Sequence, residues 1–390
     1  MSVVLPTLGE LDLFSAPEVC MIITAGDSGS GVLLPGLVRG IYPYLGGSVS
    51  PGELRSAVRE YGCAVVPGRN GAKVVRECPG ALVDPFKYCL SETAVPGSLF
   101  QFDEWRERQR AARVPICLTD SPRIVARDRA ALRQALRRWA REAHPALAVL
   151  PLDPWWLRAG LSCLIDEVST ARRPVAVVLM DAYNGLDVAG AVAGLVAFVS
   201  AVAPLPVVLV RCDVSAVGAV ACGASAGFVG ISSSTRHGAI PMSRSGDQDQ
   251  DGERDDSPSV FVPALHAYLR SSKLPAISRG GANDILRCYD SVCAGESLLQ
   301  VSRLAETNLK AARTRAYRHN LAAHEQLAQR VFAAAEPKDA WWEQCRSGAD
   351  QTAALIEQGI SLSVPRWLRQ WLELGSPSHE PTKVSLSQRR

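Results

Sequence analysis

The chain has 390 residues, of which 47% are hydrophobic, and its 42 Lys and Arg residues nearly balance 39 Asp and Glu residues. A chain this long and this apolar can bury a large core, which excludes a disordered or fibrous protein. The net charge of +3 excludes a strongly basic nucleic-acid-binding protein, so any surface for nucleic acid has to be local.

Cysteine usage and apolar runs indicate the compartment. Eleven cysteines, an odd number, are scattered through the chain, and no secretory leader opens it. This usage is typical of a reducing cytosol rather than of a disulfide framework, so we expect a cytoplasmic protein. The longest apolar run, residues 188–204, is short for a bilayer span and lies between two strand-like segments. We therefore expect a buried helix there and no membrane partner.

Short apolar segments recur along the first 231 residues, and helical stretches separate most of them. Their alternation predicts parallel strands that are buried on both faces. Eight such strands close a (β/α)8 TIM-like barrel, which is the predicted α/β fold, and an open doubly wound sheet is the alternative. The predicted strands are residues 19–24, 62–66, 80–83, 114–118, 146–150, 174–180, 206–210 and 227–231.

Carboxylates follow five of these strands. In a barrel, side chains at the carboxyl ends of the strands surround the mouth where catalysis takes place. An aspartate at that position can also simply cap the following helix, so each of them has two interpretations. The five residues are Asp84, Asp120, Asp153, Asp181 and Asp213.

The C-terminal part departs from the alternating pattern. We expect a barrel domain over residues 1–280, which includes a flexible acidic loop at 242–259 and a helix at 261–270. A zinc-binding turn and helical extension follow at residues 281–375, with one long helix at 298–335 and helical structure again at 338–373. The polar tail at residues 376–390 is predicted to be disordered.

A spaced group of Cys, Asp and His residues lies in this extension. Cys288, Asp290 and Cys293 fall within one turn, and His319 follows Cys293 after twenty-five residues. Two thiolates, an imidazole and a carboxylate can complete a tetrahedral zinc shell, with His324 as the alternative to Asp290. The other interpretation is that the cysteines are small buried hydrophobes and His319 is a solvated helix residue.

This group resembles the zinc motif of the tRNA-guanine transglycosylase family, C-x-C-x2-C followed after twenty-five residues by His and commonly by Asn-Leu. Asp290 stands at the middle cysteine. Residues 213–238 are similar to the family's last two barrel strands, after which a Thr-Arg pair follows, here Thr235 and Arg236. The resemblance covers about residues 205–335. It implies a barrel with structural zinc, base exchange at the N-glycosidic bond of a nucleobase, and tRNA or DNA as the partner.

The family's nucleophilic aspartate precedes the Thr-Arg pair, where this chain has no carboxylate. Either Asp213 or Asp181 is then the catalytic residue, or the protein is a non-catalytic subunit that binds nucleic acid or a catalytic partner. An unrelated barrel enzyme that binds a small phosphorylated substrate at residues 232–236 is the third possibility. The predicted substrate contacts are Asp120, Asp153, Trp156, Tyr183, Ser232 and Arg236.

Basic residues on the long helix offer a local surface for nucleic acid. Two pairs of them are spaced three residues apart, which places each pair on its own stripe of the helix and the two stripes side by side. Such a surface would bind phosphates in a salt-dependent way, although basic runs are also common on solvated helix faces. The residues are Lys310, Arg313, Arg315 and Arg318. The sequence leaves the oligomeric state open, with a homo- or a hetero-oligomer both compatible with it.

Overall fold

The structure is a computed structural model, and it describes residues 39–46, 50–68, 75–76, 78, 80–89, 102–140, 145–181, 184–239 and 255–375. Within these ranges no helix is both long and apolar enough to cross a membrane. The apolar run at 188–204 forms α6 (Ala191–Val202), whose residues are largely buried, as predicted. The tail at 376–390 and most of the acidic loop lie outside the described residues.

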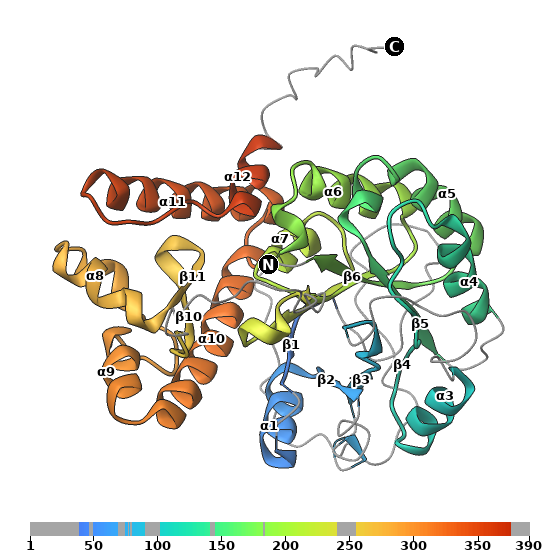
Figure 1. Cartoon of the computed structure of the whole chain (residues 1–390), viewed down its shortest axis with the longest axis horizontal. Coiled ribbons are helices and arrows are strands. Elements are labelled where there is room, and N and C mark those ends of the chain that lie inside the picture. Colours follow the sequence, from blue (N-terminus) through green and yellow to red (C-terminus); the bar gives the residue numbers. More distant parts are fainter. Residues whose placement is uncertain are drawn as a thin grey trace, which may run out of the picture.

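Eight parallel strands form a nearly closed barrel, and the helices between them lie on its outside (Figure 1). The hydrogen-bonded order is β3-β2-β1-β8-β7-β6-β5-β4, and β3 lies beside β4. The predicted (β/α)8 TIM-like barrel is therefore confirmed. The strands are β1 (Gly40–Tyr44), β2 (Ala64–Pro67), β3 (Ala81–Asp84), β4 (Cys117–Leu118), β5 (Ala146–Leu152), β6 (Val175–Asp181), β7 (Val207–Cys212) and β8 (Ala226–Gly230).

The first helix of the barrel has sequence signals at both of its ends. α1 starts with a capping box, in which the Ser50 hydroxyl accepts from the backbone of Glu53 at 3.2 Å and the Glu53 carboxylate accepts from the backbone of Ser50 at 2.9 Å. The positive φ of Gly62 ends this helix. The barrel helices are α1 (Pro51–Tyr61), α3 (Phe102–Ala111), α4 (Arg129–Ala140), α5 (Leu161–Ala171), α6 and α7 (Ser215–Ala221).

The first strand of the barrel differs from the prediction. Residues 19–24 lie outside the described residues, and β1 pairs with β8 instead, from Gly40 opposite Ala226 to Tyr44 opposite Gly230. Pro43 lies within this strand, opposite Val229, and proline is rare inside a sheet because it lacks an N–H donor. That is why residues 40–44 do not stand out as a strand in the sequence.

Side chains alternate between two apolar clusters along β5, β6 and β7. On β5, Leu147 and Val149 belong to the cluster inside the barrel, whereas Ala148 and Leu150 belong to the cluster under the outer helices. This period of two follows from the pleat of the strand. The strands are therefore buried on both faces, and only the residues at their ends reach the mouth of the barrel.

The segment after the barrel corrects two predictions. Residues 261–270 are not a helix but belong to a hairpin, because Pro263 opens a tight turn that ends at His266, which has a φ of 48°. The predicted long helix is two helices, because the Asn308 side chain accepts from the backbone of Ala311 at 3.0 Å and caps the second one. These elements are β10 (Ser259–Val262), β11 (Ala267–Arg270), α8 (Leu274–Arg279), α9 (Leu299–Thr307) and α10 (Leu309–Phe332).

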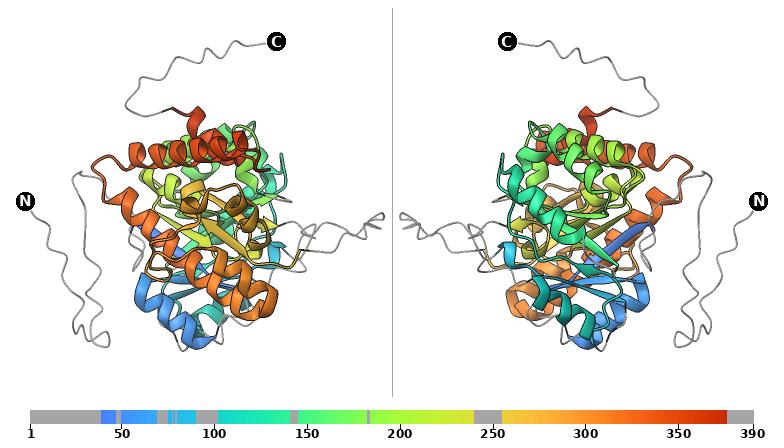
Figure 2. Two further views of the ribbon diagram at one scale, coloured as in Figure 1. Left: turned by 90° about the vertical axis from the view of Figure 1, so that its left-hand side faces the viewer. Right: turned by 90° about the vertical axis from the view of Figure 1, so that its right-hand side faces the viewer.

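Helix α10 joins the extension to the barrel. Its later part lies against α7 and β1, and the Tyr61 hydroxyl of α1 donates to Glu325 at 3.3 Å. α10 thus covers the barrel where the eighth helix of such a fold would lie (Figure 1). Its first half packs on a third apolar cluster with the hairpin and α8, which face the viewer in the left view of Figure 2. This cluster begins at Val260, upstream of the boundary predicted at residue 281.

Helices α11 (Pro337–Glu357) and α12 (Arg366–Glu373) complete the described chain. Trp367 and Trp371 of α12 pack on Trp341 of α11, with Trp341 and Trp367 stacked at 6.3 Å between ring centroids. Gly218 of α7 allows this approach, because a Cβ there would lie 2.1 Å from the Trp341 ring. The C-terminal helices are thereby fixed on the outside of the barrel beside α6 and α7.

Candidate metal centre and barrel-mouth cleft

The four residues of the spaced Cys, Asp and His group come together in the fold. One ligand atom from each of Cys288, Asp290, Cys293 and His319 lies within 4.8 Å of the other three, and all four residues are buried. His319 is 0% exposed, so the interpretation of it as a solvated helix residue is wrong. The cluster can hold a metal ion, and its ligand types are compatible with zinc.

The turn that carries the first three residues is shaped by Asp290. Its Oδ1 accepts from the backbone N–H of Val292 at 2.9 Å and of Cys293 at 2.6 Å, which places Cys293 beside Cys288. The turn closes through Gly295, whose φ is 89° and whose N–H donates to the Cys288 oxygen at 2.7 Å. One carboxylate oxygen therefore builds the turn, while Oδ2 remains among the ligand atoms.

His319 reaches the cluster from α10 with a defined ring orientation. Its Nε2 lies 2.6 Å from the backbone oxygen of Phe261, which can only accept, so Nε2 carries the proton and Nδ1 faces the cluster. Burial opposes protonation of Nδ1, but hydrogen bonds with Asp290 and Cys288 outweigh it and raise the pKa of His319 to about 9. A cation would therefore displace a proton from this nitrogen.

The distances fit a zinc ion. Tetrahedral zinc with bonds of about 2.0–2.3 Å holds sulfur and nitrogen ligands roughly 3.6 Å apart. Nδ1 of His319 lies 3.6 Å from Cys288 Sγ and 3.4 Å from Cys293 Sγ. Oδ2 of Asp290 is closer, at 2.7 Å from Nδ1 and 3.0 Å from Cys288 Sγ, because these contacts are hydrogen bonds. A cation between the four atoms would replace these hydrogen bonds with coordination bonds.

The thiol protons set the conditions for metal binding. A hydrogen bond with Cys293 and burial raise the pKa of Cys288 well above its usual range. Metals bind the thiolate form, so binding must release this proton, and the affinity should rise with pH. His324, the predicted reserve ligand, is not part of the group. Its Nε2 lies 2.5 Å from the Tyr268 hydroxyl instead.

A cleft of about 560 Å³ opens at the mouth of the barrel. Three segments far apart in the sequence line it: the ends of β6, β7 and β8 with their following turns, the hairpin, and the chain before α12. Its lining residues include Asn184, Asp187, Asp213, Arg236, His237, His266, Tyr268, Lys273 and Trp367. Two of the predicted site residues, Asp213 and Arg236, are therefore in one cleft.

Asp213 is the most strongly perturbed carboxyl group in this cleft. Its Oδ2 accepts from the Asn184 amide at 2.6 Å, and its Oδ1 accepts from the Ser215 N–H at 2.9 Å at the start of α7. Burial raises the pKa of Asp213 to about 6. Asp213 therefore holds the backbone just before α7 and is also a titratable group at the barrel mouth, while its catalytic role stays a prediction.

Arg236 and Ser232 face different partners. The Arg236 guanidinium lies 3.5 Å from the centroid of the Tyr268 ring, and its Nη2 donates to Ser259 Oγ at 3.0 Å. The Ser232 hydroxyl is hydrogen-bonded within its own turn, at 3.0 Å from Thr235 Oγ1. The turn at residues 232–235 thus uses its hydroxyl groups for its own structure, whereas Arg236 belongs to the cleft.

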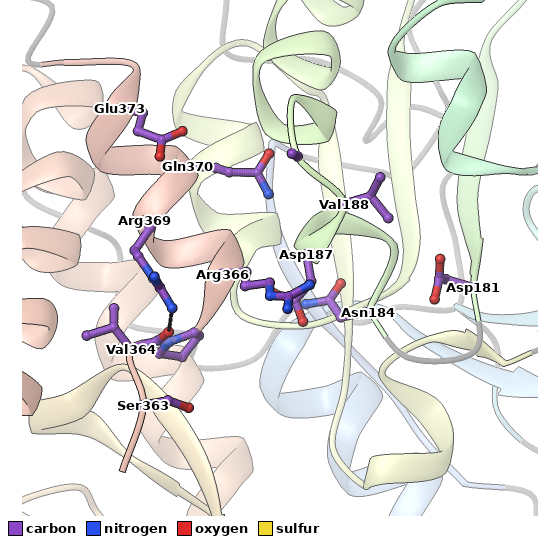
Figure 3. Close-up of a pocket in the computed structure, with 12 residues that line it drawn as sticks. Asp181, Asn184, Asp187, Val188, Ser363, Val364, Arg366, Arg369, Gln370 and Glu373 are labelled. Atoms are coloured by element: carbon purple, nitrogen blue, oxygen red, sulfur yellow. Dashed lines mark hydrogen bonds between the residues drawn. The ribbon is translucent and has the colours of Figure 1, made fainter.

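Asp181 lines a second, larger cleft of about 990 Å³, which shares Asn184 and Asp187 with the first (Figure 3). Arg366, Arg369 and Glu373 of α12 form its opposite wall. Asp187 stands between the two clefts, and its Oδ1 accepts from the backbone of Trp367 at 2.9 Å. Burial raises the pKa of Asp187, and the charge of Asp181 adds to this effect.

The remaining predicted substrate contacts that the structure describes line neither cleft. Trp156 is only 1% exposed and donates from its ring nitrogen to the Val125 oxygen at 3.0 Å, so it packs in the core and offers no stacking surface. Asp153 caps the turn at Pro154–Leu157 and pairs with Arg123 at 3.4 Å. Asp120 is fully buried at the end of β4. Tyr183 lies outside the described residues.

Part of the predicted basic surface on α10 is exposed to solvent. Lys310, Arg313 and Arg318 are exposed, and Arg313 donates to the backbone oxygen of Asp256 at 3.3 Å. Arg315 is half-buried and forms an ion pair with Glu296, next to the metal turn. Three of the four residues therefore face solvent, and the fourth has a structural partner.

Asp84, one of the five predicted strand-end carboxylates, is fully buried in a polar cluster inside the barrel whose other members were not predicted. Asp84 accepts from the Tyr44 hydroxyl at 2.6 Å and from the Tyr88 hydroxyl, and the Arg211 guanidinium lies 4.5 Å from the Phe86 ring centroid. Arg211 has a φ of 55° at a bulge in β7, which turns it into the barrel. Its position within an apolar strand gives no sign of this in the sequence.

Sequence reasoning also missed Asn184, Asp187 and Tyr268. Asn184 and Asp187 closely follow a predicted strand end, so the rule that selected Asp181 could have found them. Tyr268 lay in a predicted helix and had no such signal. No protein-family model matches the chain, and a search of curated proteins finds no match. The fold and the sites define a (β/α)8 barrel protein with a Cys/Asp/His cluster able to hold a metal ion.

Proposed function

We propose that the protein is a transglycosylase-like enzyme that exchanges a nucleobase at an N-glycosidic bond in tRNA or DNA. The observation that carries this proposal is the buried carboxyl group of Asp213 in a cleft at the barrel mouth, directly after β7. Barrel enzymes place their catalytic groups at this end of the strands. The spacing of the metal-binding group supports the same family resemblance.

Base exchange requires a nucleophile and a proton donor. In the proposed reaction, Asp213 Oδ2 attacks C1′ of the nucleoside, the N-glycosidic bond breaks, and its electron pair leaves with the purine. Asp187, whose pKa is raised by burial, donates a proton to the leaving base and then receives one from the incoming base, which displaces Asp213. Asp181 is the alternative nucleophile, since it lines the adjoining cleft.

Arg236 and zinc have supporting roles in this proposal. Arg236 Nη1 has no hydrogen-bond partner among the described residues, so it can neutralise a phosphate or another anionic group of the substrate. Cys288, Asp290, Cys293 and His319 would hold zinc as a structural ion that fixes the extension to α10. No catalytic step involves the metal, because the cluster is buried and lines neither cleft.

A non-catalytic binding subunit is the second candidate. Two observations favour it. The strand β8 carries no carboxylate, and both carboxylate oxygens of Asp213 already accept hydrogen bonds. A protein of this kind would bind the nucleic acid or a catalytic partner through the same cleft. The small phosphorylated substrate is less favoured, because the hydroxyl of Ser232 is bonded within its turn and lies apart from the contacts of Arg236.

Trapping of a covalent intermediate tests the proposal. Zinc-loaded protein is incubated with tRNA or with DNA, quenched under denaturing conditions and analysed by intact mass. We expect an adduct on wild-type protein that is lost in Asp213→Asn and retained in Ser232→Ala. An adduct retained in Asp213→Asn but lost in Asp181→Asn would move the nucleophile to β6. Loss in Ser232→Ala with both aspartate variants active would contradict the assignment.

A further inference from the structure

The side chain of Asn320 joins three backbone groups. It is 1% exposed, and its Oδ1 accepts from the Phe261 N–H at 2.7 Å. Its Nδ2 donates to the Ser259 oxygen at 3.0 Å and to the Ile231 oxygen at 3.1 Å. Ser259 and Phe261 belong to β10, whereas Ile231 directly follows β8. One amide therefore fixes the hairpin to the end of the last barrel strand.

The hairpin depends on this connection. β10 pairs only with β11 among the described strands, with Phe261 opposite Tyr268. On its other edge the N–H and oxygen of Phe261 are both bound by neighbouring residues of α10, the oxygen by His319 Nε2 at 2.6 Å and the N–H by Asn320. The two side chains thus take the place of a neighbouring strand and fix the position of β10 along the barrel.

The hairpin in turn holds Arg236. The guanidinium lies on the Tyr268 ring and donates to the Ser259 hydroxyl, and it is 6% exposed. The Tyr268 hydroxyl is itself fixed by His324 Nε2 at 2.5 Å. Ser259 is the link between the two sets of contacts, because its backbone oxygen binds Asn320 while its hydroxyl binds Arg236. Any shift of β10 against β8 would move both partners of the guanidinium.

We propose that Asn320 is a positioning residue that sets the orientation of Arg236 in the barrel-mouth cleft through β10 and Tyr268. A buried guanidinium needs fixed partners, and both of its partners lie on the hairpin rather than on the barrel that carries Arg236. The metal cluster on the same helix anchors α10 but does not touch Arg236. This inference does not require base exchange, so it stands or falls separately from the proposed function.

Substitution of Asn320 by aspartate tests this role with little change in shape. The carboxylate cannot donate to the Ser259 and Ile231 oxygens, so the hairpin loses its connection to β8. Arginine side chains are labelled with ¹⁵N, and the Arg236 Nε–H resonance is assigned by its absence in Arg236→Lys. In wild-type protein we expect this resonance to be displaced by the ring current of Tyr268. In Asn320→Asp we expect it to move to the position of exposed arginines.

Arg211 is the internal reference. It also lies on an aromatic ring, that of Phe86, but its partners are the Ser234 and His237 oxygens of the barrel. Its resonance and one equivalent of bound zinc should therefore persist in Asn320→Asp. Asn308→Asp on the same helix is the matched control, because aspartate caps a helix as well as asparagine does. It should leave the resonances of Arg236 and Arg211 unchanged.

Two further variants make the test decisive. Asn320→Ala removes the donor without adding charge, and Tyr268→Leu removes the ring while leaving Asn320 intact. Both should lose the displaced Arg236 resonance and keep that of Arg211. The proposal is overturned if Arg236 keeps its displaced resonance in the Asn320 variants. It is also overturned if the Arg211 resonance or the zinc is lost with it, or if neither Asn320 variant folds, because Asn320 would then support the whole fold.

Discussion

The Nε2 atom of His319 donates to the backbone oxygen of Phe261 at 2.6 Å, and this single contact fixes two features of the molecule. It turns Nδ1 toward Cys288, Asp290 and Cys293, which is the nitrogen a metal would bind. It also ties α10 to β10, one strand of the hairpin that lines the barrel-mouth cleft. The metal cluster and the cleft are therefore neighbours in structure although they are separate sites.

The first prediction concerns metal content. Protein purified without chelators should contain one equivalent of zinc, and free zinc at 100 times its dissociation constant should raise the free energy of unfolding by about 2.7 kcal/mol. Asp290→Cys should release zinc to a chelator more slowly than wild type, because a thiolate is the softer ligand. Cys293→Ser should release it faster. Well under one equivalent in the wild-type protein would contradict the site.

The second prediction concerns the pH dependence of stability at Asp213. Its pKa is about 6 in the fold and 3.8 as an ordinary carboxyl group, so the unfolded chain releases the proton first as pH rises. Wild-type protein should therefore lose up to about 3 kcal/mol of stability at this residue between pH 4 and 6. Asp213→Asn should be the more stable protein above pH 6 and equal to wild type near pH 4.

Denaturant unfolding of both proteins at several pH values checks this. Because all other titrating groups are shared, only the difference between the two free energies of unfolding matters. A constant difference from pH 4 to pH 8 would mean that Asp213 does not titrate as described. A difference of the opposite sign above pH 6 would mean that the carboxylate is stabilised by the fold.

The third prediction concerns Trp156, which the sequence analysis gave as a substrate contact. Because the ring is 1% exposed, Trp156→Ala should lower the free energy of unfolding by about 3–5 kcal/mol. Trp342→Ala on α11, where the ring is half-buried, is the control and should cost less. If Trp156→Ala keeps its stability but loses nucleic-acid binding, the ring is a ligand contact after all.

The fourth prediction concerns the basic stripe on α10. Lys310→Glu and Arg313→Glu together should leave thermal stability nearly unchanged and weaken the retention of RNA or DNA at low salt. The slope of log affinity against log salt should decrease by about 0.7 for each single-strand phosphate contact removed. Arg315 is left unchanged, because its ion pair with Glu296 gives it a structural role.

Arg346→Glu on α11 provides the control for that measurement, since this side chain is 57% exposed and lies on another helix. It should change neither the affinity nor the salt slope. Equal effects from the α10 and α11 variants would point to general charge rather than to a surface on α10. Wild-type protein without any salt-sensitive binding would remove the support for a nucleic-acid partner.

Much of the barrel was predictable because its strands are short apolar runs between helices. The exceptions have local physical causes. Residues 40–44 form β1, which pairs with β8, but Pro43 makes this segment unlike a strand in the sequence. The prediction of a helix at residues 261–270 is wrong because a tight turn joins two short strands there. Pro263 opens this turn, and His266 ends it with a left-handed backbone conformation. Asn308 divides the long helix by capping its second half, which composition alone does not show.

Of the two candidate sites, one could be predicted from the sequence and the other could not. The metal cluster could be predicted because its residues are close in sequence except for His319, and because zinc restricts ligand types and spacing. The cleft could not, since it is assembled from separate segments of the chain between Asn184 and Trp367. Tyr268 and Asn320 matter through tertiary contacts, which leave no periodic pattern. Asp213 was found because the end of a barrel strand is a defined place in the fold.

The most direct test of the proposed base exchange is incorporation of labelled guanine into tRNA, and separately into DNA, by zinc-loaded protein. We expect time-dependent label in the nucleic acid with wild-type protein and none with Asp213→Asn, while Ser232→Ala retains most of the activity. If folded wild-type protein that contains one equivalent of zinc transfers no label to either nucleic acid, base exchange of guanine is contradicted, and the non-catalytic binding subunit becomes the better account.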